Sequence, residues 1–128
     1  MTRFFQPAIA LGFVLVLLAL LAVSLAPPGS PLGQVALWPG DKASHIAAFY
    51  ALTALSMAVF PRAHILILCL ALGLLGAGIE YGQGFVGREV SVRDMIANFI
   101  GMLIALLPVA MHSLRLALKV RRAGEARP

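Results

Sequence analysis

Long uncharged stretches alternate with short polar segments along most of this chain. A helix needs about 20 apolar residues to cross the hydrocarbon core of a bilayer, and four stretches approach that length. Because a spanning segment must satisfy its backbone hydrogen bonds internally, each stretch is predicted to be helical. We expect one all-α transmembrane domain over residues 1–128, a four-helix bundle. Its predicted helices cover residues 4–26, 42–61, 63–82 and 93–114, and a basic cytoplasmic tail covers residues 115–128.

Composition agrees with this pattern. The chain has 128 residues, of which 61% are hydrophobic and 12% are charged, with a mean hydropathy of +0.96. A soluble domain of this length could not bury so much apolar side chain. The sequence therefore indicates a multi-pass integral membrane protein.

The first stretch has a second interpretation as a secretory signal peptide, because Arg3 precedes an apolar run that ends in small residues. The run is longer than the about 7–15 residues of a usual signal core, and Pro27 and Pro28 follow it directly. We favour a retained helix. Residues 27–40 are then predicted to form an external loop rich in proline and glycine, with Trp38 suited to the head-group region.

Lysine and arginine indicate the orientation. With both termini in the cytoplasm, seven basic residues lie inside and only Lys42, Arg88 and Arg93 lie outside. We therefore expect both termini to be cytoplasmic. The basic tail, which explains much of the net charge of +5, is interpreted as a topology anchor with affinity for anionic lipid. No aromatic residues interleave it, so no nucleic-acid partner is expected.

The same topology gathers the polar residues of the predicted helix ends at the outer side. An Asp, Lys or Arg at the centre of a bilayer costs roughly 2.5–3.5 kcal/mol, so charge inside apolar sequence usually faces a cavity or a partner. Three helix ends contribute, and together they predict one outward-facing site. Its expected ligand-binding residues are Asp41, Lys42, His45, Glu80, Gln83, Arg88, Asp94 and Asn98.

Structural explanations compete with a functional one for several of these residues. Asp41 could cap the second helix, and Ser91 with Asp94 fits the S-x-x-D capping box of the fourth. Lys42 could reach the head groups without a partner. His45, one turn inside the membrane, is harder to explain in this way, because a buried imidazole needs hydrogen-bond partners.

Small residues indicate close helix contacts. Gly78 and Gly82 form a G-x-x-x-G motif beside Glu80, and such motifs let helices approach closely. That approach would bring Glu80 near the second or fourth helix. Gly101 and Ala105, four residues apart on the fourth helix, suit the same contact.

The polar residues form two clusters along the chain, Asp41 to His45 and Glu80 to Asn98. The order of these clusters and the spacing within each of them resemble the VanZ-like family of small bacterial membrane proteins. One departure is visible, because the family often has Tyr four residues after the histidine and this chain has Phe49. The resemblance implies a bacterial inner (plasma) membrane location and a link to envelope maintenance or to resistance against the glycopeptide antibiotic teicoplanin. It supplies no biochemical activity and does not show that this chain confers resistance. The matching string is Asp41-Lys42-x-x-His45, then Glu80-x-x-Gln83-x-Phe85-x-x-Arg88-x-x-Ser91-x-x-Asp94-x-x-x-Asn98-x-x-Gly101.

Several functions remain open at this point. The first is binding of an anionic cell-envelope lipid or precursor, and the second is a membrane enzyme using His45, Glu80 or Asp94 for acid–base chemistry. A transporter or proton relay is a third class, but the polar residues lie at one face and the inner halves of the helices offer no continuous polar path. A structural or assembly subunit and a homo-oligomer are further alternatives. No cofactor is expected. His45, Glu80 and Asp94 could chelate a metal, but the positive charges of Lys42 and Arg88 argue against one, so we expect no metal.

Overall fold

The computed structural model describes residues 2–35 and 41–125, and its regular structure there is entirely helical. No strand occurs among the described residues, most of which are helical, and this confirms the all-α prediction. Three helices are long and apolar enough to cross a membrane, over Gln6–Ser24, Ile65–Phe85 and Val92–Lys119, as expected of a membrane protein. The elements are α1 (Thr2–Ser24), α2 (Pro31–Val35), α3 (Asp41–Val59), α4 (Ile65–Phe85) and α5 (Val92–Glu125).

The turn between α3 and α4 has local causes. α3 ends at Val59 rather than at the predicted residue 61, and the proline at position 61 disfavours helical backbone in the residue before it. α4 starts after His64, whose Nδ1 accepts a hydrogen bond from the backbone N–H of Leu66 at 3.3 Å. The histidine thus satisfies one of the unpaired amides of the first turn.

α4 ends on a glycine that adopts a left-handed conformation. Gly87 has φ of +78°, and the backbone N–H of Arg88 donates to the carbonyl of Gln83 at 3.0 Å. This is the six-to-one bond of a Schellman motif, which favours glycine at this position. α4 continues three residues beyond the predicted end at residue 82. The motif determines the direction in which the chain leaves the helix and thus the position of Arg88.

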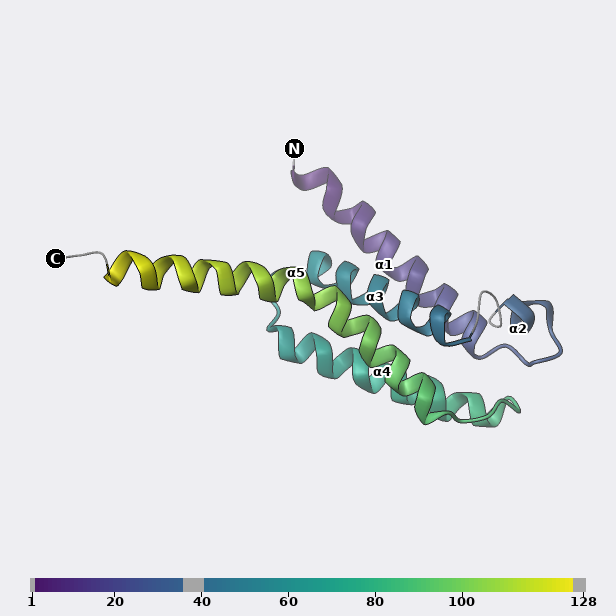
Figure 1. Cartoon of the computed structure of the whole chain (residues 1–128). Coiled ribbons are helices and arrows are strands. Elements are labelled where there is room, and N and C mark those ends of the chain that lie inside the picture. The colour runs from purple at the N-terminus through teal and green to yellow at the C-terminus, as the bar shows by residue number, and fades with distance from the viewer. Residues whose placement is uncertain (1, 36–40, 126–128) are drawn as a thin grey trace.

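Two predicted irregular segments contain helix. The basic tail predicted from residue 115 is helical to Glu125, because lysine and arginine are good helix formers. α5 contains Pro108, and its ribbon changes direction before its yellow end projects beyond the other helices (Figure 1). The predicted loop over residues 27–40 includes the short α2. Trp38 lies outside the described residues.

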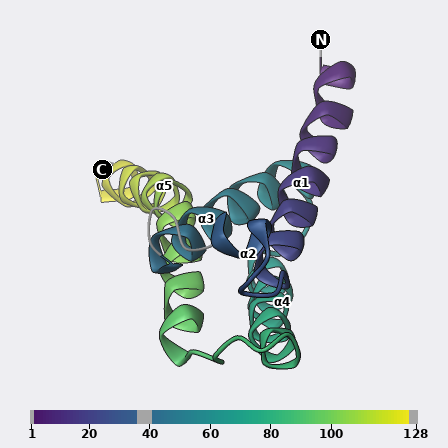
Figure 2. The same cartoon turned by 90° about the vertical axis from the view of Figure 1, so that its right-hand side faces the viewer.

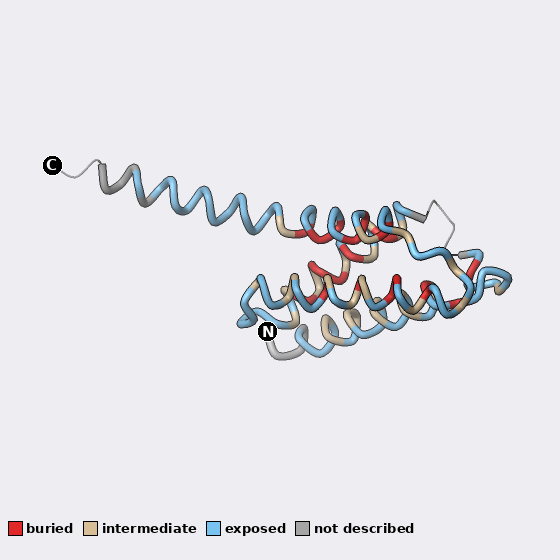
Figure 3. Tube along the Cα trace, turned by 90° about the horizontal axis from the view of Figure 1, so that it is seen from below, coloured by how far each residue is buried: buried red, intermediate tan, exposed pale blue. Residues whose placement is uncertain are grey.

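The four long helices run alternately up and down, as the bundle prediction requires. The C-terminal ends of α1 and α4 and the N-terminal ends of α3 and α5 lie at one end of the molecule, on the right in Figure 1. α3 contacts α1, α4 and α5 and packs most extensively against α5; Figure 2 views this end of the bundle. Buried positions lie where the helices face one another, whereas the C-terminal part of α5 is exposed (Figure 3).

The bundle interior is apolar in its middle and closely packed. A side chain at Gly101 would collide with the backbone of α3, at the carbonyl of Ile46 and the N–H of Tyr50. Gly101 and Ala105 are buried, so the contact predicted for them is confirmed. The central apolar cluster contains Phe49, Leu52, Leu72, Ile79 and Met102.

The contact predicted for the G-x-x-x-G motif is wrong. Gly78 has open space where a side chain would lie, and Gly82 faces Leu25, which follows α1. The close approach of α4 to α3 and α5 occurs instead at Gly76, whose added Cβ would lie 3.1 Å from Asn98 Nδ2 and 3.2 Å from the Phe49 ring. The motif was found in the right helix, but the rotation of that helix presents a different glycine to its neighbours.

Candidate functional site

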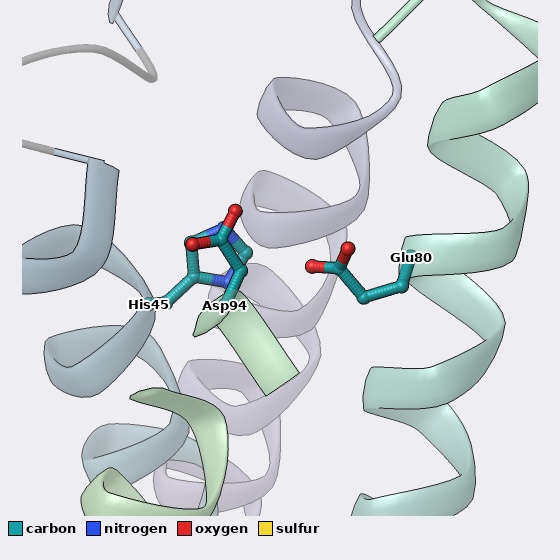
Figure 4. A group of neighbouring side chains, drawn as sticks. All are labelled: His45, Glu80 and Asp94. Atoms are coloured by element: carbon teal, nitrogen blue, oxygen red, sulfur yellow. The ribbon is translucent and has the colours of Figure 1, made fainter. Parts of the chain in front are cut away.

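Buried polar side chains from three helices meet near the end of the bundle. His45 lies in the second turn of α3, Glu80 near the end of α4, and Asp94 in the first turn of α5. One potential ligand atom from each residue lies within 4.8 Å of the other two. Figure 4 shows the Glu80 carboxylate pointing from α4 toward His45 and Asp94. The structure therefore brings together the three residues that the sequence named as candidates for acid–base chemistry.

Asn98 joins this group by fixing the orientation of the histidine. His45 Nδ1 and Asn98 Oδ1 are 2.8 Å apart, and Asn98 is only 3% exposed. Because an amide oxygen accepts but cannot donate, the proton of the neutral imidazole lies on Nδ1. In that tautomer, Nε2 is the ring nitrogen that could act as a base or a ligand.

The Glu80 carboxylate caps the start of α5. Its Oε2 accepts a hydrogen bond from the backbone N–H of Ser91 at 3.0 Å, and Glu80 is 1% exposed. In a capping box this N–H would bond to Asp94, three residues later. The capping-box interpretation of Asp94 is therefore wrong, because a residue from another helix takes its place.

Gln83 and Arg88 bind the end of α1, a role that the sequence did not predict. Gln83 Nε2 donates to the carbonyl of Ser24 at 3.2 Å, and Arg88 Nη1 donates to the carbonyls of Val23 and Ser24 at 3.2 and 3.3 Å. The last carbonyls of a helix have no partner within it and carry partial negative charge. The two side chains thus connect the end of α4 and the residues after it to α1. The sequence signal for this role is the end of the first helix itself, because its last carbonyls need donors from elsewhere.

The two remaining residues of the predicted site lie at the start of α3. Lys42 is exposed and does not join the buried group. α3 begins at Asp41, but the side chain of Asp41 lies outside the described part of the structure, so the capping prediction for it stays a prediction. Among the predicted site residues whose side chains are described, Lys42 is thus exposed and Arg88 is half-buried, whereas the buried ones are His45, Glu80, Gln83, Asp94 and Asn98.

Two cavities meet at Gln83 and Arg88. The first, which we call the apolar groove, has a volume of about 270 Å³ and a surface that is mostly carbon. It follows α1 toward its C-terminal end and includes two serines, Ser24 and Ser44, that the sequence analysis did not select. Its lining residues are Val16, Ala19, Leu20, Val23, Ser24, Ser44, His45, Ala48, Gln83 and Arg88.

The second cavity, which we call the polar cleft, has a volume of about 440 Å³ and a mostly polar surface. Three basic residues line it, together with the two acidic residues Glu89 and Asp94. Lys42 and Arg93 are exposed on its margin, and Arg88 lies between the cleft and the apolar groove. Its lining residues are Pro28, Gly33, Lys42, Gln83, Gly87, Arg88, Glu89, Ser91, Arg93 and Asp94.

Comparison with known proteins finds no match for this chain among family models, curated proteins or solved structures.

Proposed function

We propose that this protein binds an anionic amphiphilic lipid of the bacterial cell envelope, or a lipid-linked envelope precursor, at the end of its helix bundle. The observation that carries the proposal is the continuity of the two cavities. An apolar groove along α1 leads to a polar cleft lined by basic residues, and Gln83 and Arg88 belong to both. Cavities of roughly 300–1,000 Å³ are typical of small-molecule sites, and the polar cleft falls in that range.

The division of the lining favours an amphiphile over a wholly polar ligand. Val16, Ala19 and Leu20 are spaced three and four residues apart and so share one face of α1, which lines the groove. There they would contact a hydrocarbon chain. In the cleft, Lys42, Arg88 and Arg93 outnumber the two acids, which favours a phosphate or carboxylate head group. A lipid whose chain lies in the groove would place its head group at these cations.

The proposal includes the membrane topology. α3 would form a fourth span, inside a bacterial inner membrane, with both termini in the cytoplasm. α3 contacts all three spanning candidates, so its polar residues can be shielded from lipid. Two of them satisfy their hydroxyl groups within the helix, Thr53 on the carbonyl of Phe49 at 2.6 Å and Ser56 on the carbonyl of Thr53 at 2.9 Å.

The VanZ-like resemblance is part of the same proposal. It is supported by the convergence of His45, Glu80, Asp94 and Asn98, since residues far apart in the resembling string meet at one place. A role in envelope maintenance or glycopeptide resistance would follow from binding an envelope lipid.

Binding can be tested by titrating the delipidated protein in detergent with three probes, phosphatidylglycerol, a polyprenyl phosphate and zwitterionic phosphatidylcholine, and counting bound lipid by native mass spectrometry. We expect the two anionic probes to bind more tightly, and the difference between them to distinguish a membrane phospholipid from a precursor carrier. Replacing Lys42 and Arg93 together with Gln should weaken anionic binding about tenfold. Arg62→Gln is the charge control, because Arg62 lies in the turn between the end of α3 and the start of α4.

The groove provides a second, steric arm of the experiment. Ala48 lines the groove, whereas the neighbouring Ala47 is exposed and does not line it. Ala48→Phe should therefore block binding and Ala47→Phe should leave it unchanged. Equal binding of all three probes, or equal effects of the two substitutions, would show that the cavities do not hold the lipid and would leave the bundle with a structural or assembly role.

The clustering of His45, Glu80 and Asp94 supports a second candidate, an enzyme that acts on the bound lipid. In its neutral form, His45 could accept a proton through Nε2 from water or from a lipid hydroxyl. Purified protein would then convert an envelope lipid, and His45→Ala would bind the lipid without converting it. Chromatography of the probe lipids after incubation distinguishes this enzyme from a binding protein.

A further inference from the structure

Three side chains of types that bind transition metals meet inside the bundle. His45, Glu80 and Asp94 come from three helices, each is buried, and their nearest potential ligand atoms lie within 4.8 Å of one another. Zinc ligands stand about 2.0–2.2 Å from the ion, which separates them by no more than roughly 4 Å. If the carboxylate oxygens moved by about 1 Å, all three ligand atoms could lie at bonding distance from one ion.

The histidine is held in the way that metal-bound histidines are held. A ligating imidazole almost always donates its other N–H to an oxygen acceptor, which fixes its tautomer and its ring orientation. Here His45 Nδ1 donates to Asn98 Oδ1 at 2.8 Å. Nε2 would then be the ligand atom, and Asn98 would be a positioning residue.

Glu80 shows the corresponding arrangement for a carboxylate ligand. Its Oε2 accepts the backbone N–H of Ser91 at 3.0 Å, and such hydrogen bonds commonly orient ligating carboxylates. The bond ties Glu80, which comes from α4, to the start of α5, where Asp94 lies. Two of the three candidate ligands are thus oriented by groups outside the set itself.

Neither of the two positive charges that argued against a metal belongs to the buried group. Lys42 is exposed, and the hydrogen bonds of Arg88 Nη1 go to the carbonyls of Val23 and Ser24. Glu80 and Asp94 are 1% and 6% exposed, so an ion bound between them would be shielded from bulk water.

We propose that His45, Glu80 and Asp94 bind a divalent transition metal of the zinc or manganese class. One imidazole and two carboxylates suit these ions better than magnesium or calcium, which prefer oxygen ligands alone. Three protein ligands leave a fourth position open. His45 lines the apolar groove and Asp94 lines the polar cleft, so the ion lies between the two cavities. The site does not depend on lipid binding.

The first test uses the unmodified protein. After treatment with a chelator, it is dialysed against Zn²⁺, and bound metal is counted by inductively coupled plasma mass spectrometry. We expect about one Zn²⁺ per chain, with affinity in the order Zn²⁺ above Mn²⁺ above Mg²⁺. X-ray absorption at the zinc edge should show one imidazole and otherwise oxygen ligands. Substoichiometric binding, or a spectrum without imidazole, would overturn the proposal without reference to any variant.

The second test uses matched variants. His45→Ala and Asp94→Asn should each lower zinc affinity at least about 100-fold, and Asn98→Ala should lower it about 10–100-fold while leaving all three ligands in place. His112→Ala, which changes an exposed histidine outside the two cavities, should have no effect. Equal binding by His45→Ala and His112→Ala would sink the assignment. Lipid binding is measured separately with the phosphatidylglycerol titration, so failure of one proposal is distinguishable from failure of the other.

Discussion

At the scale of single residues, hydrogen bonds between helices hold the buried polar group together. Asn98 accepts the Nδ1–H of His45, and Glu80 accepts the N–H of Ser91. A buried donor that loses its acceptor costs about 1–3 kcal/mol, more than the net contribution of the bond itself. The group therefore stabilises the bundle as well as forming a candidate site.

Replacing Asn98 with Ala should lower the free energy of unfolding by about 1–3 kcal/mol, because His45 Nδ1 would stay buried without its acceptor. The measurement is unfolding of the metal-free protein in a denaturing detergent, followed by circular dichroism.

Ser113→Ala is the matched control on the same helix. It removes an exposed hydrogen bond, from the Ser113 hydroxyl to the carbonyl of Val109 at 3.0 Å, and should change the free energy of unfolding by less than about 0.5 kcal/mol. Equal losses in the two variants would contradict the buried role of Asn98.

The residues of this group could be predicted from the sequence, but their pairs could not. Polar types inside apolar stretches identified His45, Glu80 and Asn98, because the bilayer makes such residues rare without a purpose. The S-x-x-D pattern assigned the Ser91 amide to Asp94, and the structure gives it to Glu80. A local sequence pattern gives no information on where a neighbouring helix lies. It therefore cannot show that a side chain from that helix, here Glu80, accepts the hydrogen bond instead.

At the scale of helices, the glycine at position 101 determines how closely α3 and α5 approach. Its missing side chain leaves room for the carbonyl of Ile46 and the N–H of Tyr50. Backbone atoms cannot rotate away as a flexible side chain can. Any larger residue at Gly101 must therefore separate the two helices.

Gly101→Ala should destabilise the bundle by about 1–3 kcal/mol through overpacking. Gly12→Ala is the matched control, since a side chain at Gly12 meets nothing within 4 Å, and alanine in an open helical position is neutral or stabilising. Both variants are measured by the same detergent unfolding. A neutral Gly101→Ala would mean that α3 and α5 do not approach this closely.

Helix positions followed from the sequence better than helix rotations and ends. Apolar length located all four long helices, whereas G-x-x-x-G named Gly78 and Gly82 in place of Gly76. The rotation of α4 depends on how Phe49 and Asn98 fill the space beside it, which no single segment reveals. The end of α5 was placed too early because basic residues were interpreted as a tail, although they also favour helix.

At the scale of the whole molecule, the proposed topology places the loop before α3 and the turn after it on opposite sides of the membrane. It can be tested with single cysteines at exposed Gly29 and Ala63 in a Cys69→Ala background. A membrane-impermeant maleimide should label Gly29→Cys in intact cells and Ala63→Cys only after permeabilisation.

This labelling pattern tests the fourth span directly. If α3 did not cross, both cysteines would react from the same side. The opposite pattern, with Ala63→Cys alone reacting in intact cells, would place the termini outside and contradict the orientation inferred from basic residues.

The length of α5 between two of its charged residues can be compared with the thickness of a bilayer. At a rise of about 1.5 Å per residue, the helical segment from Asp94 to Arg115 extends roughly 32 Å, close to the hydrocarbon thickness of about 30 Å. If α5 crosses a bilayer with Arg115 at one boundary of the hydrocarbon core, Asp94 therefore lies at the opposite boundary. In the proposed orientation, a lipid of the outer leaflet holds its head group at that depth, so it could reach the cleft by lateral diffusion alone, without leaving the membrane.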